Sequence, residues 1–435
     1  MKWQVFNLNQ IMTSLESGSR PRGGAILDSE GIPSIGGEHI GNDGKVRFNN
    51  LKFIPKDYYQ TLNKGQIIIN DILIVKDGAT TGKTAFVSND FPFNEAAVNE
   101  HVFIVRLNSK VINPKYGFYW LFSSQGQLQI LSDFRGSAQG GITRNFVSQV
   151  KIPLPPISEQ YRIVEILDQA DALRKMRSDA DTKAERILPA LFIKIFGDPL
   201  TWTDVNTEPL GSLVNIQSGG TPSKKNPDYW DGDIPWVSPK DMKQDVIVDS
   251  IDHISQKAIE ETNIRYVEPG AILIVVRGMI LAHTIPLAIA ATRITINQDM
   301  KALYPNCSAI DSIYLHAALK ASSRRILSQV GTAGHGTRKF DTDELLKLPI
   351  LIPSQEQLRK FQLAVTDCRA SLAGISNTKE KLDKLFNTLL ERAFSGELTA
   401  KWREAHIKEL LAEMEAQAKA LNLRNNGDYQ QLSML

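Results

Sequence analysis

The tetrapeptide Ile-Leu-Ile-Val occurs at Ile72–Val75 and again at Ile272–Val275, and these two copies decide the fold. A run of four apolar, largely β-branched residues is typical of a buried strand. Other pairs of landmarks follow in the same order and at a similar spacing. They are Ser-Gly-Ser-Arg-Pro at 17–21 and Ser-Gly-Gly-Thr-Pro at 218–222, Ile-Pro at 32–33 and 234–235, Thr-Arg at 143–144 and 337–338, and Lys-Ile-Pro at 151–153 and Lys-Leu-Pro at 347–349.

The period of this repeat, about 200 residues, is larger than the 20–50 residues of a solenoid and indicates a duplicated domain. Two related halves on one chain suit a ligand that presents two related sites, as duplex DNA does to dimeric repressors. A gene duplication without functional meaning explains the repeat equally well at this point.

Each copy begins with an α+β region. Strand-sized apolar runs alternate with turns, and residues 114–131 and 310–327 predict short helices. A longer helix follows, because apolar residues from Leu358 to Ala393 recur at steps of three and four, which is a heptad seam. Ser354 is the expected N-cap of this helix and Gly396 its expected end.

The corresponding helix of the first copy has a weaker seam. Its apolar positions run from Ile163 to Leu191, Arg177 occupies one of them, and Pro189 is expected to kink or restart the helix. Since neither helix can bury its apolar stripe alone, we expect the two to pack antiparallel and to hold the globular parts at opposite ends. The alternative is that each helix packs only on its own domain. A third helix, polar and rich in Ala, Glu and Lys, is expected at 402–423.

Composition excludes several classes of protein. The chain has 435 residues, of which 42% are hydrophobic, and 50 Lys and Arg nearly balance 48 Asp and Glu, so charge alone does not announce a nucleic-acid binder. Two cysteines, Cys307 and Cys368, form neither a disulfide framework nor a zinc site and favour a reducing cytosol. No apolar run approaches the length of a membrane span or a signal peptide, so a soluble protein is expected.

A phosphate-binding loop is suggested by Gly-Ala-Thr-Thr-Gly-Lys-Thr at 78–84. Only three residues separate its glycines where four are needed, and the second copy lacks the Gly-Lys pair, which argues against an ATPase. The loop could instead meet DNA phosphates, or be a plain hairpin turn.

Asp228 with Asp241 and Lys243 matches the permissive carboxylate and lysine pattern of Mg²⁺ nucleases, but the first copy has no equivalent. The seven histidines include no HExxH pair, and the Asn-Pro-Pro-aromatic motif of amino-methyltransferases is absent. No catalytic motif therefore survives in a convincing form.

A family resemblance rests on several strings. Residues 218–223 (Ser-Gly-Gly-Thr-Pro-Ser), Tyr-Trp at 229–230, Ile-Pro-Trp-Val-Ser at 234–238, Leu-Pro at 348–349 with Glu-Gln at 356–357, and Ala-Phe-Ser-Gly-Glu-Leu at 393–398 resemble the specificity subunit of type I restriction-modification enzymes. The first half agrees through Ile-Pro-Leu-Pro-Pro at 152–156, Glu-Gln at 159–160 and Phe-Gly-Asp-Pro at 196–199. Departures are Ser-Ile at 34–35, where the second copy has Trp-Val, and Pro189.

The resemblance implies an α+β protein with two tandem target-recognition domains joined by two long antiparallel coiled-coil helices in a pseudo-twofold arrangement. Each domain would read one half of a bipartite double-stranded DNA target, and the helices would set the spacer and dock two modification (methyltransferase) subunits. The subunit itself would catalyse nothing. S-adenosylmethionine, ATP and Mg²⁺ would be bound by the modification and restriction subunits, in the cytoplasm and away from any membrane.

The boundaries expected for these parts divide the chain into five. They are recognition domain 1 at 1–155, the first spacer helix at 156–197, recognition domain 2 at 198–353, the second spacer helix at 354–396, and a helical extension at 397–435.

The expected DNA contacts are cations in the turns of both copies, since such side chains grip phosphates and read base edges. They are Arg20, Arg22, Lys76, Lys83 and Arg144 in the first domain, and Lys224, Lys225, Lys240, Arg277 and Arg338 in the second. Glu38, His39 and Asp241 are weaker candidates for cytosine amino groups. For each cation a solvated surface charge is the plain alternative, and an interaction scaffold or a nuclease remains the rival function.

Overall fold

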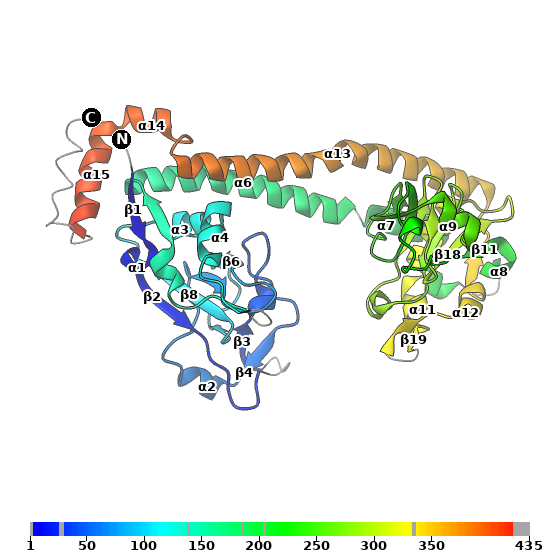
Figure 1. Ribbon diagram of the computed structural model, residues 1–435, viewed down its shortest axis with the longest axis horizontal. Coiled ribbons are helices and arrows are strands. Elements are labelled where there is room, and N and C mark those ends of the chain that lie inside the picture. Colours follow the sequence, from blue (N-terminus) through cyan, green and yellow to red (C-terminus); the bar gives the residue numbers. More distant parts are fainter. Residues whose placement is uncertain are drawn as a thin grey trace. The chain divides into compact units, whose positions relative to one another are not determined.

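A computed structural model describes residues 3–25, 30–136, 140–184, 186–202, 206–332 and 336–420. The chain forms two compact units (Figure 1), unit 1 from residues 1–176 and 379–435 and unit 2 from residues 177–378. The described part of the chain contains no helix that is both long and apolar enough to cross a membrane.

Unit 1 contains three small sheets with strand orders β1-β9, β2-β8-β5-β6 and β4-β3-β7. The strand β5 lies inside the four-stranded sheet, antiparallel to both neighbours, and all four of its residues are buried. The strands are β1 Gln4–Asn7, β2 Met12–Ser17, β3 Ile32–Ile35, β4 Lys52–Ile54, β5 Ile72–Val75, β6 Thr84–Phe86, β7 Ala97–Val98, β8 Val102–Leu107 and β9 Lys151–Leu154.

Unit 2 repeats this topology. Its sheets have the orders β10-β21, β11-β18-β15-β16-β13 and β14-β12-β17, with β13 as an additional edge strand and a separate hairpin β19-β20. Register is repeated as well, because Ile72 pairs with Val105 and Ile272 pairs with Leu303. The strands are β10 Thr207–Pro209, β11 Val214–Ser218, β12 Ile234–Val237, β13 Val246–Ile247, β14 Asp252–Ile254, β15 Ile272–Val275, β16 Leu287–Ala290, β17 Thr295–Ile296, β18 Met300–Pro305, β19 Gly331–Thr332, β20 Arg338–Lys339 and β21 Pro349–Leu351.

Helices cover these sheets and continue into the two long helical segments. Those before the first long segment are α1 Leu8–Ile11, η1 Gly37–His39, α2 Lys56–Gln60, α3 Pro114–Phe122, α4 Ser124–Leu131 and α5 Phe146–Gln149. The others are α6 Ile157–Ala184, α7 Ile187–Phe196, η2 Pro199–Thr201, α8 Leu210–Leu213, η3 Pro227–Tyr229, α9 Gln256–Glu261, η4 Met279–Ala282, α10 Ser312–Ala321, α11 Ser323–Ser328, α12 Thr342–Leu346, α13 Gln355–Ser395, α14 Ala400–Ala405 and α15 Ile407–Ala420.

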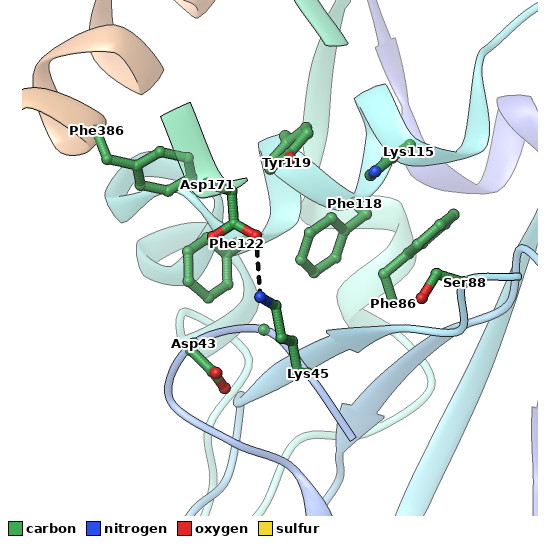
Figure 2. Close-up of a pocket in the computed structure, with 11 residues that line it drawn as sticks. Asp43, Lys45, Phe86, Ser88, Lys115, Phe118, Tyr119, Phe122, Asp171 and Phe386 are labelled. Atoms are coloured by element: carbon green, nitrogen blue, oxygen red, sulfur yellow. Dashed lines mark ion pairs between the residues drawn. The ribbon is translucent and has the colours of Figure 1, made fainter. Parts of the chain in front are cut away.

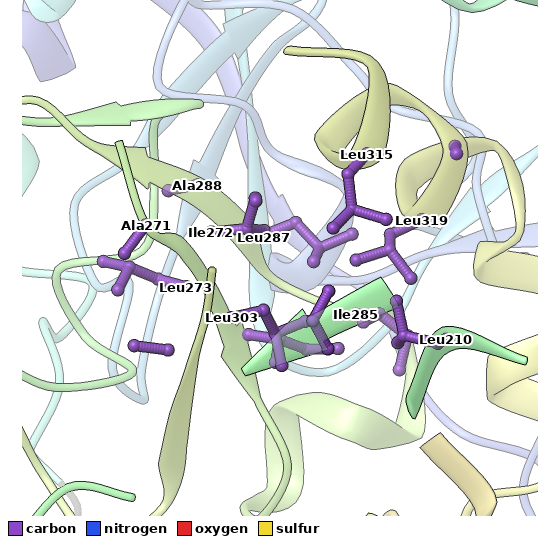
Figure 3. Packing of buried hydrophobic residues seen from close by; sticks show 14 of the residues in the cluster. Leu210, Ala271, Ile272, Leu273, Ile285, Leu287, Ala288, Leu303, Leu315 and Leu319 are labelled. Atoms are coloured by element: carbon purple, nitrogen blue, oxygen red, sulfur yellow. The ribbon is translucent and has the colours of Figure 1, made fainter. Parts of the chain in front are cut away.

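The core of unit 2 is built around β15, whose four residues are all buried, and α10 packs on this sheet. Ile272 and Leu273 are fully buried and pack in one cluster with Leu315 and Leu319 (Figure 3). Burying each such side chain stabilises the unit by about 1.5–3 kcal/mol relative to exposure. The Ile-Leu-Ile-Val tetrapeptide is therefore a central strand in both units, as predicted, and the duplicated α+β fold is confirmed.

The long helix α13 begins and ends where its local sequence predicts. The Ser354 hydroxyl accepts from the Gln357 amide (3.2 Å) while the Gln357 side chain accepts from the Ser354 amide (3.1 Å), which is a capping box. At the other end Gly396 has φ +83°, a conformation that glycine adopts without a Cβ penalty. Leu372 and Ile375 of the expected seam belong to a stretch whose side chains lie outside the described residues.

Proline divides the first long helix as expected. α6 ends at Ala184 and α7 starts at Ile187, so Pro189 lies in the first turn of α7, where a missing amide hydrogen costs no intrahelical bond. Arg177, which interrupts the apolar seam, forms an ion pair with Asp181 one turn later.

Within unit 1, α6 and the C-terminal part of α13 pack antiparallel. The Arg174 side chain bonds to Asp383 (2.7 Å), while Glu159, at the opposite end of α6, bonds to Thr399 just beyond the end of α13. Both helices also pack on the α+β domain, since Phe394 contacts Tyr116 (ring centroids 5.4 Å). Helix pairing and packing on a domain were expected as alternatives, and unit 1 has both.

The C-terminal extension folds as α14 and α15 rather than as the single helix expected from residue 402, and residues 421–435 lie outside the described part. Glu413 of α15 accepts from the amide and hydroxyl of Ser158 (3.0 and 2.8 Å), so it caps the start of α6. A carboxylate is favourable there because the first amides of a helix lack intrahelical acceptors.

Candidate nucleic-acid interface

The loop between β5 and β6 is a hairpin turn, which is one of the structures that its sequence allowed. The amides of Thr81, Gly82 and Lys83 donate to the carbonyls of Gly78, Val75 and Thr80 at 2.9–3.2 Å. Because these amides bond within the turn, they are not arranged to wrap a phosphate as a nucleotide-binding loop would. The turn would therefore contribute to DNA binding through its cationic side chains, Lys76 and Lys83.

In unit 1 this turn lies beside the segment that precedes α5. The amide of Ile142 donates to the carbonyl of Lys76 (2.8 Å), which brings Lys76 close to the segment that carries the exposed Arg144, two residues after Ile142. Lys83 is half-buried, and Arg22 is exposed on the loop after β2.

Carboxylates accompany the cations of unit 1. Arg20 pairs with Glu100 (2.7 Å) and Lys76 with Asp77 (3.6 Å), while His101 lies between the two carboxylates. A mixed cluster of this kind offers acceptors for cytosine amino groups as well as donors for phosphates and guanine. Asp77 and Glu100 were not predicted from the sequence, although their positions beside Lys76 and His101 are a local signal.

In unit 2 the equivalent turn carries a stronger concentration of positive charge. Arg277 forms a backbone bridge with Lys339, and the amide of Gly278 donates to the carbonyl of Arg338 (3.0 Å). Lys301 lies nearby on β18, and partial burial together with the charge of Lys339 lowers the pKa of its ammonium group. Lys339 also pairs with the carboxylate of Asp341, so this turn too carries an acidic partner. A cluster of cations favours the binding of a polyanion.

Lys301 and Lys339 were missed by the sequence analysis. Lys301 stands in an apolar strand at the position where unit 1 has Phe103, since Ile274 pairs with Lys301 and Ile74 with Phe103. Comparing the two copies strand by strand would have revealed this exchange of an aromatic residue for a cation. Lys339 directly follows Arg338, and the basic pair is itself a signal.

The remaining predicted cations of unit 2 lie in other loops. Lys224 and Lys225 are exposed before η3, in the loop that reaches Gln298 through Thr221. Lys240 lies after β12 and pairs with Asp252 (2.6 Å), so the structure groups it with that carboxylate and not with Arg277.

Two of the weaker candidates for base contacts have structural roles. The buried His39 accepts from the amide of Gly36 through Nδ1 (2.9 Å) and is 2% exposed, so it cannot reach a base. Asp241 accepts from the amide and hydroxyl of Ser238 and from the amide of Ile251 at 2.9–3.0 Å, so it fixes a loop. The structure therefore gives both side chains a role inside the protein, and Glu38 is the exposed member of the three.

The geometry gives the nuclease alternative no support. Both oxygens of Asp241 already accept hydrogen bonds, and Asp228 pairs with Lys257 (2.7 Å). Among the described residues no three His, Cys, Asp or Glu side chains gather as metal ligands would. Asp228, Asp241 and Lys243 match the nuclease pattern in sequence only.

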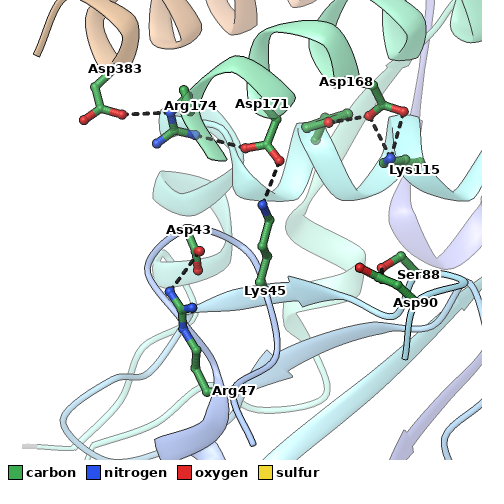
Figure 4. Close-up of polar contacts among 11 residues, drawn as sticks. Asp43, Lys45, Arg47, Ser88, Asp90, Lys115, Asp168, Asp171, Arg174 and Asp383 are labelled. Carbon is green, nitrogen blue, oxygen red and sulfur yellow. Dashed lines mark hydrogen bonds and ion pairs between the residues drawn. The ribbon is translucent and has the colours of Figure 1, made fainter. Parts of the chain in front are cut away.

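A network of charges fastens the α+β domain of unit 1 to its helices. Figure 4 shows Lys45 paired with Asp171 (3.2 Å), and Arg174 joining Asp171 to Asp383 of α13. Lys115 pairs with Asp168 (2.8 Å). The network spans three segments far apart in sequence, so it fixes the orientation of the domain on the helices.

A small cavity of about 80 Å³ lies at this junction (Figure 2). Phe118, Phe122 and Phe386 supply its apolar lining, and Arg174 stacks on Phe386 at 4.4 Å. The hydroxyl of Tyr119 donates to Asp168 (2.6 Å), and burial together with this bond raises the pKa of the phenol. Tyr119 therefore stays protonated, and the cavity belongs to the domain–helix joint rather than to a catalytic centre.

The contact between an α+β domain and a long helix is repeated in both units. In each unit the helix end in this contact belongs to the other copy. In unit 1, Tyr116 donates to the carbonyl of Pro153 and contacts Phe394 of the second long helix. In unit 2, Tyr314 donates to the carbonyl of Leu351 and contacts Phe196 of the first long helix. Both hydroxyl bonds are 2.7 Å long. Each α+β domain is thus held by the end of the helix that belongs to the other copy.

Comparison with known proteins agrees with this architecture. The family model for the type I restriction modification DNA specificity domain matches residues 1–181 and 203–377. The specificity subunit of the type I restriction enzyme EcoR124I/EcoR124II from Escherichia coli is 29% identical over 307 residues, covering 67% of this chain and 71% of that one. The HindI specificity subunit from Haemophilus influenzae is 20% identical over 425 residues, covering 80% and 90%.

A solved structure has a similar fold. A chain from a study of complex assembly and conformational transition in a type I R-M system superposes with a TM-score of 0.53 at 19% identity, covering 91% of this chain and 98% of that one. Because the family model matches most of the chain, once in each half, this protein belongs to the type I restriction-modification DNA specificity family and carries two DNA specificity domains.

Proposed function

We propose that each α+β domain reads one half of a bipartite DNA target and that the chain acts as the specificity subunit of a restriction-modification complex. The observation that carries this proposal is the repetition of one cationic turn at the same place in both units, directly after β5 and directly after β15. Two equivalent reading surfaces on one chain match two half-sites on a duplex.

The proposed recognition domains are residues 1–155 and 198–353. Their proposed contacts are Arg20, Arg22, Lys76, Lys83 and Arg144 in the first domain, and Lys224, Lys225, Lys240, Arg277 and Arg338 in the second. Lys301 and Lys339 join the second set. Arg20 and Lys240 would exchange their carboxylate partners for phosphate, whereas Arg277 and Arg338 approach the duplex from a cluster of like charges.

The long helices are proposed to act as the spacer and to dock two modification subunits. Residues 156–197 and 354–396 supply them, and Glu413 of α15, in the extension proposed at 397–435, braces the start of α6. S-adenosylmethionine, ATP and Mg²⁺ would be held by the modification and restriction subunits, and the assembly would act on double-stranded DNA in the cytoplasm.

The test is a domain exchange. Residues 1–155 are replaced by the corresponding domain of a relative with a different target, and methylated adenines are mapped in cells that carry the modification subunits. We expect one half of the recognised sequence to change while the other half and the spacer length stay the same. If both halves change together, or if the wild-type complex methylates without sequence preference, the proposal is wrong.

A further inference from the structure

The turn after β15 carries two adjacent apolar side chains that face solvent. Met279 is 64% exposed and Ile280 is 42% exposed, while the next residue, Leu281, is buried and anchors the turn in the core. In unit 1 the same positions hold Ala79 and Thr80. The two copies therefore differ in chemistry at the tip of the turn that the proposed function assigns to DNA.

The tip is held rigidly. Gly278 has φ +137°, which a residue with a side chain rarely adopts, and its amide donates to the carbonyl of Arg338. The amides of Leu281 and His283 donate to the carbonyls of Gly278 and Ile280 at 3.2 and 3.1 Å. Met279 and Ile280 are thus presented on a fixed turn, which lowers the entropy lost when a ligand covers them.

Cations surround this apolar tip. Arg277 precedes it in the chain, and Arg338 and Lys339 lie on β20, which packs against η4. Lys339 is paired with Asp341 and would exchange this carboxylate for a phosphate. An apolar tip among cations fits a polyanion with an apolar interior, which describes a DNA duplex with phosphates outside and stacked bases inside. Protein interfaces are depleted of lysine but enriched in Met and Arg, so residue composition does not separate the two kinds of ligand. The DNA specificity domain that the family model matches over residues 203–377 favours DNA.

We propose that Met279 and Ile280 form an apolar wedge that inserts at a base step of the second half-site and unstacks it, while Arg277, Arg338 and Lys339 hold the flanking phosphates. This inference rests on the proposed function, since it requires that unit 2 binds DNA. It also predicts an asymmetry between the half-sites. The first domain, with Ala79 and Thr80 at this position, should leave its half-site stacked.

The test uses the complete complex with its modification subunits and a duplex that carries the mapped target. 2-Aminopurine, whose fluorescence rises when it is unstacked, replaces one base at a time in each half-site, away from the methylated adenine. The test variant is the double substitution Met279→Ala with Ile280→Ala. The matched control is Val248→Ala with Ile251→Ala, since these side chains are 62% and 65% exposed on another loop of unit 2.

For the wild-type complex we expect enhanced fluorescence at one step of the second half-site. In the test variant this signal should disappear and affinity should fall about tenfold. The slope of affinity against salt should not change, because no phosphate contact is removed. The control variant should behave as wild type.

Fluorescence that persists in the test variant would overturn the wedge while leaving the proposed function intact. So would a variant that binds DNA normally but no longer assembles with the modification subunits, because the tip would then dock on protein. A wild-type complex that binds both half-sites without preference over random DNA would instead contradict the proposed function.

Discussion

The buried ion pair between Glu159 and Arg403 allows a sharp test of how the C-terminal extension holds unit 1. Glu159 is fully buried and accepts from Arg403 Nε (2.8 Å), Thr399 Oγ1 (2.6 Å) and Trp3 Nε1 (3.2 Å). Replacing Arg403 by Met leaves the carboxylate buried without its countercharge. Loss of one partner of a buried pair costs about 3–5 kcal/mol in unfolding free energy.

The double variant Glu159→Leu with Arg403→Met should recover part of that loss, because no unpaired charge stays buried. The recovery is incomplete because Thr399 and Trp3 lose their acceptor. Thr399→Val should cost about 1.5–3 kcal/mol, since it removes a hydrogen bond to a charged acceptor. Arg392→Met is the matched control. Arg392 is 53% exposed in its loose pair with Glu397 (3.8 Å), and such surface pairs contribute little.

Urea unfolding followed by hydrogen–deuterium exchange of peptides from α6 and α14 measures these values in unit 1. Exchange of peptides from β15 and β18 provides an internal reference in unit 2, which lacks these residues. If Arg403→Met destabilises unit 1 no more than Arg392→Met does, or if the double variant is as unstable as Arg403→Met, the extension is not held by this buried pair and the reasoning is refuted.

Three further predictions concern unit 2. Arg277→Ala should weaken DNA binding by the complex and make the slope of log affinity against log salt shallower by about one, which a salt titration checks; an unchanged slope would exclude a phosphate contact. Phe361→Ala should destabilise unit 2 by about 3–5 kcal/mol in urea unfolding, because Phe361 is fully buried against Phe192 and Phe196. The pKa of Lys301 is lower in the folded protein than in the unfolded chain, so the folded protein releases this proton more readily. The free energy of unfolding should therefore rise with pH from the lowered pKa up to about 10.5. Lys301→Met should remove this rise and stabilise unit 2 at neutral pH while weakening DNA binding. A variant less stable than wild type would contradict an unfavourable burial of the Lys301 charge and its repulsion from Lys339.

Each α+β domain packs on the end of the long helix that belongs to the other copy. Tyr116 of the first copy packs on Phe394, and Tyr314 of the second copy packs on Phe196. Neither α+β domain is held only by its own copy's helix, so a change in either helix bears on both domains. This arrangement also explains why both aromatic anchors stand near the ends of their helices.

Local signals predicted much of the fold. The capping box at Ser354, the left-handed Gly396 and the restart before Pro189 each depend on a few neighbouring residues, so they could be placed from the sequence. The same holds for the buried strands β5 and β15. The C-terminal helix was predicted less well, because the chain breaks at His406, between α14 and α15, where the apolar periodicity gave no sign of an end.

The candidate interface could be predicted only in part. Basic residues in turns were recognisable, but whether a cation is free or paired depends on carboxylates far away in sequence, as with Arg20 and Glu100. Asp241 looked available for a base or a metal and proved to be bonded to Ser238 and Ile251. Lys301 was not predicted because it lies in a mostly apolar strand, whereas the predicted cations lie in turns.

The sequence alone determined that the chain is a duplicated α+β unit with long helices, and it determined the family, because repeats, periodicity and short motifs are local properties of the chain. The tertiary structure decided which helix end anchors which domain, which charges are neutralised, and that Met279 and Ile280 stand exposed among cations. These features depend on side chains from distant segments meeting in space. Such encounters are set by the packing of the whole unit and have no signature in any single stretch of sequence.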